Sequence, residues 1–317
     1  MKTVSQSIRD ATGEELSLRR GDLVRVRQPG EIAATLDAFG MLDGLPFMPE
    51  MIQHCGKTYK VAYHVEKTCV DGYSDTFRAF EQDDVVFLED LRCDGEAHDG
   101  CARACRLFWK EAWLERMDDA ASPAPEPVAR TERALEGMLG TRRADDTYLC
   151  QSTALVSATV PLPRIDRLFK IAEDIRIGNR SPLDAVRQIS GSLAVKLKGQ
   201  LFGKWPAGAL AKTPTLSLDL KPGDWVEVRS VDEIRATLDP AGKNRGLRFT
   251  NEMSAYCGKQ FPVKYVLDRM ILEHTGEMLT VRNTVILDNV HCRCMYAIGG
   301  CHRAENSYWR EIWLRRV

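Results

Sequence analysis

The 317-residue sequence has no apolar run long enough to cross a bilayer, and its start, MKTVSQSIRDATGEELSLRRGD, lacks the apolar stretch of a signal peptide. These absences predict a soluble, cytoplasmic protein with no membrane partner. An excess of charge is also missing, because 44 Lys and Arg stand against 45 Asp and Glu, for a net charge of −1. Proteins that bind a phosphate backbone carry a basic surplus, so nucleic acid is disfavoured as a partner.

Several enzyme motifs are absent too. The chain has no G-x-x-x-x-G-K-[ST], no G-x-G-x-x-G after a predicted strand, no G-x-S-x-G and no H-E-x-x-H. The sequence therefore argues against an ordinary nucleotide-dependent enzyme and against a serine hydrolase.

The chain does contain ten cysteines. Reducing conditions in the cytoplasm disfavour structural disulfides, which leaves metal ligation, catalysis or simple burial as their role. The composition is otherwise that of a globular protein, with 44% hydrophobic and 28% charged residues, and the length suits two domains.

An internal repeat organises the sequence. Four stretches of the first part recur about 200 residues later: GDLVRVRQPGEIAATLD from Gly21 and GDWVEVRSVDEIRATLD from Gly223; GLPFMPEMIQHCGK from Gly44 and GLRFTNEMSAYCGK from Gly246; DVVFLEDLRC to Cys93 and NTVILDNVHC to Cys292; CARACRLFWKEAWLERM from Cys101 and CHRAENSYWREIWLRRV from Cys301. The few small insertions between copies predict two units of the same fold.

Each unit is predicted to be mainly β. Alternating apolar residues in LVRV and WVEV indicate half-buried strands, and further strands are expected after each Cys-Gly-Lys turn and in DVVFLEDL and NTVILDNV. The EIAATLD and EIRATLD stretches favour a short helix, and the closing segments FWKEAWLERM and YWREIWLRRV are compatible with a strand or a short helix.

A compact unit that opens with Gly-Asp and alternating valines, as in GDLVRVR and GDWVEVR, resembles the SH3-like small barrels. The resemblance implies a partly open barrel with a binding face between loops, and no particular ligand. The C-G-K turn, the later cysteines and the W-[KR]-E-x-W-L ending resemble bacterial proteins and imply no activity. The cysteines depart from ordinary SH3 domains, so proline-rich peptide binding is not carried over.

The predicted fold class is therefore mainly β with α: two tandem SH3-like barrels from an internal duplication, joined by a helical bridge. Its parts are an N-terminal tail (1–17), a first cysteine-containing barrel (18–118), a proline-rich linker and helical bridge (119–217), and a second barrel (218–317). Two amphipathic helices are expected in the bridge, one at RIDRLFKIAEDIRIGN and one starting at Ser181, with their apolar faces buried against the barrels.

A metal site is predicted in the first unit. Cys55, Cys93, Cys101 and Cys105 provide four thiolates beside turns, and a closed shell of four thiolates is typical of structural Zn²⁺. His98 is a reserve ligand. The competing interpretation is four buried, inert thiols.

The second unit repeats three of these cysteines, Cys257, Cys292 and Cys301, but has Glu305 where the first has Cys105. The fourth zinc ligand is left open between Glu305, His302 and Cys294. A shell with an exchangeable position would instead be typical of catalytic zinc, with Glu305 or His302 as general acid or base.

The unmatched Cys69 and Cys150 are interpreted as ordinary thiols. Glu111 and Glu311, shared by the closing segments, are interpreted as caps or ion-pair partners. The leading hypothesis is a zinc-binding tandem-barrel protein that acts as a binding or scaffolding module for a protein or small-molecule ligand. The alternatives are a zinc-dependent biosynthetic enzyme with its site in the second unit and, third, a nucleic-acid-binding protein.

Overall fold

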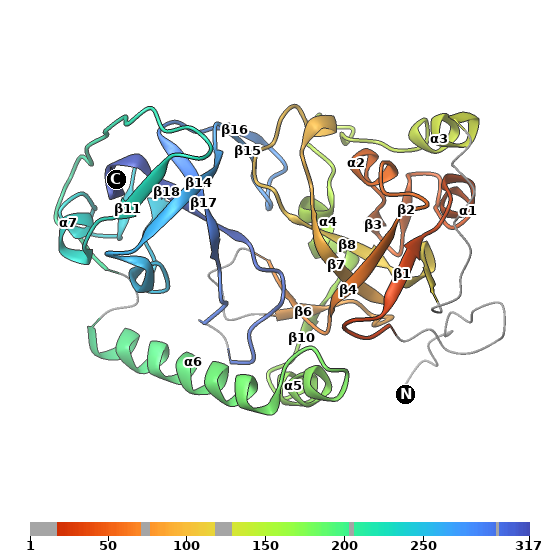
Figure 1. The fold of residues 1–317 in the computed structure, drawn as a ribbon, viewed down its shortest axis with the longest axis horizontal. Helices are drawn as coiled ribbons and strands as arrows, with labels where there is room; N and C mark the ends of the chain where they lie inside the picture. Colours follow the sequence, from red (N-terminus) through yellow and green to blue (C-terminus); the bar gives the residue numbers. More distant parts are fainter. Residues whose placement is uncertain (1–17, 71–76, 118–128, 203–205, 296–297) are drawn as a thin grey trace.

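The computed structural model describes residues 18–70, 77–117, 129–202, 206–295 and 298–317 (Figure 1). The predicted N-terminal tail and most of the proline-rich linker lie outside these residues. We call residues 18–117 the first half and residues 218–317 the second half. The fold is mixed α/β, with strands forming most of the regular secondary structure of both halves and helices concentrated between them.

The first half is built on a five-stranded antiparallel sheet of order β8-β7-β4-β1-β9. Its strands are β1 (Leu23–Val26), β4 (Thr58–His64), β7 (Val85–Arg92), β8 (Arg106–Lys110) and β9 (Leu114–Arg116). The connections contain helices α1 (Pro29–Ala33) and α2 (Pro49–Ile52), the 3-10 turns η1 (Glu96–His98) and η2 (Glu111–Trp113), and the short strands β2 (Met41–Leu42), β3 (Leu45–Pro46), β5 (Thr68–Cys69) and β6 (Phe77–Ala79).

The second half has a five-stranded sheet of the same order, β18-β17-β14-β11-β19. Its strands are β11 (Trp225–Val228), β14 (Gln260–Val266), β17 (Thr284–His291), β18 (Asn306–Arg310) and β19 (Leu314–Arg316). The connections contain α7 (Val231–Arg235), the 3-10 turns η3 (Met253–Tyr256) and η4 (Glu311–Trp313), and the short strands β12 (Lys243–Asn244), β13 (Leu247–Arg248), β15 (Arg269–Ile271) and β16 (Met278–Thr280).

The two sheets also share their register. Val24 pairs with Tyr59 and Arg116 in the first half, and Val226 pairs with Phe261 and Arg316 in the second. In each sheet the last strand returns to pair with the first, which curves the sheet into a half-barrel. The two sheets therefore fit the expected pair of tandem barrels, and the closing segments are each strand, 3-10 turn, strand.

Each half-barrel encloses its own aromatic core. In the first half Phe47 packs edge-on against Trp113 with ring centroids 5.1 Å apart, and in the second Phe249 packs against Trp313 at 5.5 Å. All four rings are at most 2% exposed. The two tryptophans of each closing segment are thus core residues in the structure.

Helices and one short strand connect the halves: α3 (Ala129–Glu136), α4 (Gln151–Ala158), β10 (Val160–Leu162), α5 (Asp166–Arg176) and α6 (Pro182–Phe202). Strand β10 pairs with β6 of the first half, and α6 runs along the lower side of the second half in Figure 1. Helix α6 starts where it was predicted, since the Ser181 hydroxyl accepts a hydrogen bond from Asp184 N at 3.1 Å.

The expected burial of both apolar helix faces is wrong. On α5 the side chains of Leu168 and Phe169 are 62% and 70% exposed, and on α6 those of Val186, Leu193 and Leu197 are 52% to 61% exposed. The α5 side chains that are buried include Arg167, Ile171 and Asp174. Polar contacts of Asp174, described below, fix the face of α5 that turns inward.

Candidate metal centre

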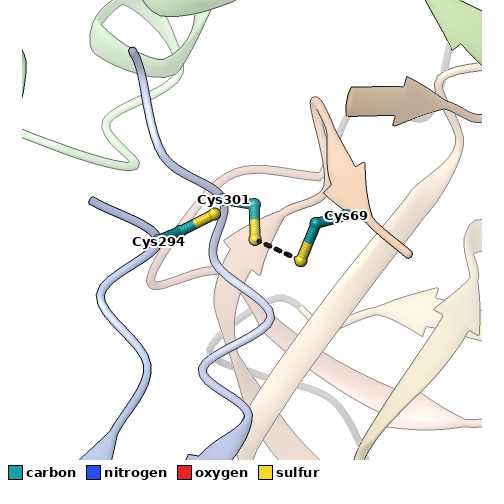
Figure 2. A group of neighbouring side chains, drawn as sticks. All are labelled: Cys69, Cys294 and Cys301. Carbon is teal, nitrogen blue, oxygen red and sulfur yellow. Dashed lines mark hydrogen bonds between the residues drawn. The ribbon is translucent and has the colours of Figure 1, made fainter. Parts of the chain in front are cut away.

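Three thiols from distant parts of the chain meet between the halves. The sulfur atoms of Cys69, Cys294 and Cys301 all lie within 4.8 Å of one another, close enough to hold a metal ion, and Cys69 Sγ is 3.5 Å from Cys301 Sγ (Figure 2). The ten cysteines are free thiols. We call these three residues the inter-half cluster.

The cluster joins the first half to the second. Cys69 ends strand β5 of the first half, whereas Cys294 and Cys301 lie in the loop between β17 and β18 of the second half. Cys292, directly after β17, adds a fourth sulfur at the edge, because Cys294 N donates a hydrogen bond to Cys292 Sγ at 3.2 Å. Cys292 also packs against the same small buried cluster.

The loop that carries Cys294 is held by a half-buried carboxylate, that of Glu252. Glu252 accepts hydrogen bonds from Arg293 N at 3.0 Å and from Met295 N, on either side of Cys294. Cys294 itself has a left-handed backbone, with φ of 53°, a conformation that is uncommon outside glycine. Glu252 thus stabilises a turn that presents the thiol inward.

The electrostatic surroundings of Cys301 favour its thiolate form. Hydrogen bonds from Cys294 and Cys69 lower the pKa of Cys301 well below its usual value, and the nearby Arg303 guanidinium acts in the same direction. Hydrogen bonds with neighbouring thiols raise the pKa of Cys294, and the largest contribution comes from the bond with Cys292. One sulfur therefore holds negative charge while its neighbours donate to it, which suits a soft cation.

The donor set and spacing fit zinc. In a tetrahedral site with Zn–S bonds of about 2.3 Å, neighbouring sulfur atoms are roughly 3.8 Å apart. The distance of 3.5 Å between the sulfur atoms of Cys69 and Cys301 is close to this spacing. Cys292 lies outside the group of sulfur atoms within 4.8 Å of one another, so a closed shell of four sulfurs, as in structural zinc sites, would require Cys292 to move inward.

Two arginines at equivalent positions, Arg103 and Arg303, carry buried charge, and Arg303 donates to the carbonyl oxygen of Cys69 at 2.9 Å. Arg303 forms ion pairs of 2.8 Å with Glu273 Oε1 and Glu305 Oε1, and Arg103 pairs with Glu305 Oε2 at 3.2 Å. Burial alone would raise the pKa of Glu305, but these guanidinium groups lower it. Glu305, expected as a zinc ligand or acid/base, is thus a charged carboxylate shared by two arginines.

His302, the other acid/base candidate, is enclosed on a different side. Its ring stacks on Tyr63 with centroids 4.3 Å apart, and its Nε2 lies 3.3 Å from Asp174 Oδ1. Asp174, fully buried on α5, also pairs with Lys67 Nζ at 2.6 Å. Burial lowers the pKa of His302, although Asp174 opposes this shift.

The predicted ligands of the first half divide into two groups. Cys93, Cys101 and Cys105 line one small cavity, together with His98 and Cys150. Cys55 lies instead in the hydrophobic core of the first half and is 4% exposed. Its counterpart Cys257 packs against the second core.

Sequence reasoning missed Cys69. It has no cysteine counterpart, because the matching position in β15 is Ile271, and its interpretation as an ordinary thiol did not anticipate its place beside Cys294 and Cys301. Cys69 and Cys301 are 232 positions apart, so no local spacing links them. The available signal was that Cys69 and Cys294 both lack partners in an otherwise matched set.

A larger cavity adjoins the cluster. It has a volume of about 400 Å³ and is bordered by Cys292, the Arg103, Arg303, Glu273 and Glu305 network, and the apolar side chains of Met253, Met270 and Leu272. This size is in the range of small-molecule sites.

No protein-family model, curated protein or solved structure matches the chain. Within the part of the chain that the structure describes, no helix is long and apolar enough to cross a membrane.

Proposed function

We propose that the protein is a zinc-binding pair of SH3-like barrels, derived from an internal duplication, that acts as a binding module. The observation that carries the zinc assignment is the contact between Cys69 of the first half and Cys301 of the second, with Cys294 beside them. Equal strand order and register in the two sheets support the duplication.

The zinc would be structural in this proposal. Cys69 and Cys294 are 2% and 3% exposed, and Cys292 provides a fourth soft ligand, so no open coordination position is needed. Zinc held by ligands from both halves would fix their relative position. The 400 Å³ cavity, lined by second-half residues together with Arg103 of the first half, would then keep a constant shape, which favours binding of a small ligand there.

The enzyme alternative has less support. Both Glu305 oxygens are paired with arginines, and the His302 ring is stacked and buried. A general base must reach a substrate proton, and neither group is free to do so in this arrangement.

Metal analysis of the full chain tests the proposal. Zinc should co-purify, and Cys69→Ser should lose one equivalent per chain. Cys257→Ser is the matched control, because Cys257 packs against the second core instead of the cluster, and it should retain the metal. A Cys69→Ser protein that is folded and keeps all of its zinc would refute the assignment.

Loss of zinc from the inter-half cluster should also destabilise the fold. Chelation should lower the melting temperature of the wild type by more than that of Cys69→Ser, since the variant has already lost this ion. An equal shift in both proteins would show that the chelated ion lies elsewhere.

A further inference from the structure

A second group of four cysteines lines part of a cavity of about 30 Å³, together with neighbours that include Met48, His98 and Arg103. Three segments provide them: Cys93 follows β7, Cys101 and Cys105 lie between η1 and β8, and Cys150 is the residue before α4. We call Cys93, Cys101, Cys105 and Cys150 the first-half quartet. Together with the inter-half cluster and Cys292, the quartet leaves only Cys55 and Cys257 outside two sets of four.

The backbone holds the quartet in place. Cys93 N donates to Cys105 O at 2.8 Å, which closes the loop where β7 and β8 end, and Cys101 N donates to His98 O at 3.2 Å. Gly95 has φ of 73°, and a Cβ there would lie 2.1 Å from Cys101 O. The loop therefore requires glycine at this position and brings its cysteines together by close backbone approach.

Cys150 is positioned by different contacts. Its N–H donates to Thr153 Oγ1 at 3.0 Å, and the Thr153 hydroxyl lies 3.1 Å from Cys150 O. These bonds hold the start of α4 against the first half. Its thiol is thereby brought to the same cavity as Cys93, a position that Cys55 does not occupy.

The sulfur atoms receive hydrogen bonds of the kind that stabilise metal-bound thiolates. Ile271 N donates to Cys101 Sγ at 3.4 Å, and the Ser152 hydroxyl donates to Cys105 Sγ at 3.5 Å. Arg103 lines the same cavity, and Arg303 Nη2 donates to the Ser152 hydroxyl at 2.9 Å. Two buried cations thus lie beside a set of thiols that would carry negative charge once metal is bound.

The sulfur atoms of the quartet are more widely spaced than those of the inter-half cluster, since among the described residues only that cluster is found to place three potential ligand atoms within 4.8 Å of one another. Four inert cysteines would be expected to pack against one another. We propose that the first-half quartet is a second structural zinc site, in which Cys93, Cys101 and Cys105 are joined by Cys150 of the helical bridge in place of Cys55. The sulfurs would draw inward onto an ion in the cavity. This site does not depend on the inter-half cluster.

Zinc stoichiometry of single variants of the full chain tests the proposal. The wild type should bind two equivalents and Cys150→Ser one, whereas Cys55→Ser should keep two. The inter-half variant Cys69→Ser should bind one, and Cys69→Ser/Cys150→Ser none. A wild type with one zinc that Cys69→Ser abolishes would overturn the second site and leave the proposed function intact. A Cys55→Ser protein with one zinc and a Cys150→Ser protein with two would assign the ligand to Cys55.

Cobalt substitution covers the case in which Cys150→Ser does not fold. Histidine is also a zinc and cobalt ligand, so Cys150→His in the Cys69→Ser background should still bind one Co²⁺. The sulfur-to-cobalt charge-transfer absorbance should fall by about a quarter, because three thiolates would remain of four. An unchanged absorbance per bound cobalt would show that Cys150 is not a ligand.

Discussion

Arg303 Nη1 of the second half donates a hydrogen bond of 2.9 Å to the carbonyl oxygen of Cys69 in the first half. Its counterpart Arg103 makes the reciprocal contact, since its Nη1 donates to Ile271 O of the second half at 3.0 Å. Each half therefore extends a short strand, β5 or β15, to an arginine of the other. The inter-half cluster lies at one of these two crossings.

We expect Arg303→Met to destabilise the protein by about 3–5 kcal/mol, because the buried Glu273 carboxylate keeps only its 3.3 Å contact with Arg103 and Glu305 also loses a partner. The side chains of Arg303 and Glu273 are 2% and 5% exposed. Urea unfolding of the zinc-loaded chain measures the change.

Arg315→Met is the control for this experiment. Arg315 also pairs with a glutamate, Glu233, but the two side chains are 45% and 40% exposed, so the change should cost about 1 kcal/mol or less. Equal losses in the two variants would contradict the buried network.

The stability of the protein should fall as the pH rises through neutrality, owing to Glu111. Burial raises its pKa from 4.5 to about 7, although the Leu18 N–H donates to it at 2.7 Å. The folded state therefore holds this proton more tightly than the unfolded chain, so the unfolded chain loses it first and gains in relative stability between about pH 5 and 7.

Glu111→Gln keeps an acceptor for Leu18 N and removes the titration. The variant should gain about 1–3 kcal/mol over the wild type at pH 8. At pH 5 the gain should be smaller, in part because His64, 3.9 Å from Glu111, is protonated there and favours the carboxylate. Urea midpoints at the two pH values check this, and parallel pH profiles would argue against a raised pKa.

Trp113→Ala and Trp313→Ala should each cost about 3–5 kcal/mol, since both remove a large buried side chain. The two indoles are equivalent, each donating from Nε1 to a threonine hydroxyl at 3.1 Å, Thr35 in one half and Thr237 in the other. Because buried ion pairs join the halves, both variants should still unfold in one transition when followed by tryptophan fluorescence and by circular dichroism. Two separate transitions would show that the halves are independent.

The exposed face of α6 predicts that Leu197→Gln changes the free energy of unfolding by no more than about 0.5 kcal/mol. Leu197 is 57% exposed, and glutamine is a good helix former. Ala185, 3% exposed on the same helix, provides the comparison: Ala185→Gln should be clearly destabilising because it overfills a packed site. A costly Leu197→Gln would mean that this face is covered in solution.

The half-barrels could be foreseen because their signals are local. Alternation in Leu23–Val26 and Trp225–Val228 and the glycine turns at Gly56 and Gly258 depend on neighbours in sequence. Glu111 and Glu311, interpreted as caps or ion-pair partners, accept hydrogen bonds from the distant backbone N–H groups of Leu18 and Leu218.

The inter-half cluster could not be foreseen in the same way. When the two copies are aligned, Cys69 matches Ile271 and Cys301 matches Cys101. The contact between Cys69 and Cys301, however, joins non-equivalent positions of opposite halves. The inward face of α5 was missed because Lys67, Arg180 and His302 converge on Asp174. Such charged contacts form only after folding and override the apolar pattern of an isolated helix.

The long separation between Cys69 and Cys301 has a consequence for synthesis on the ribosome. At about 5–20 residues per second, the 232 residues between them take roughly 10–50 s to translate. During this interval the nascent first half exposes a thiol whose partners do not yet exist. Completion of this site would therefore be among the last events of biogenesis, and a truncated chain would be left with an unprotected cysteine.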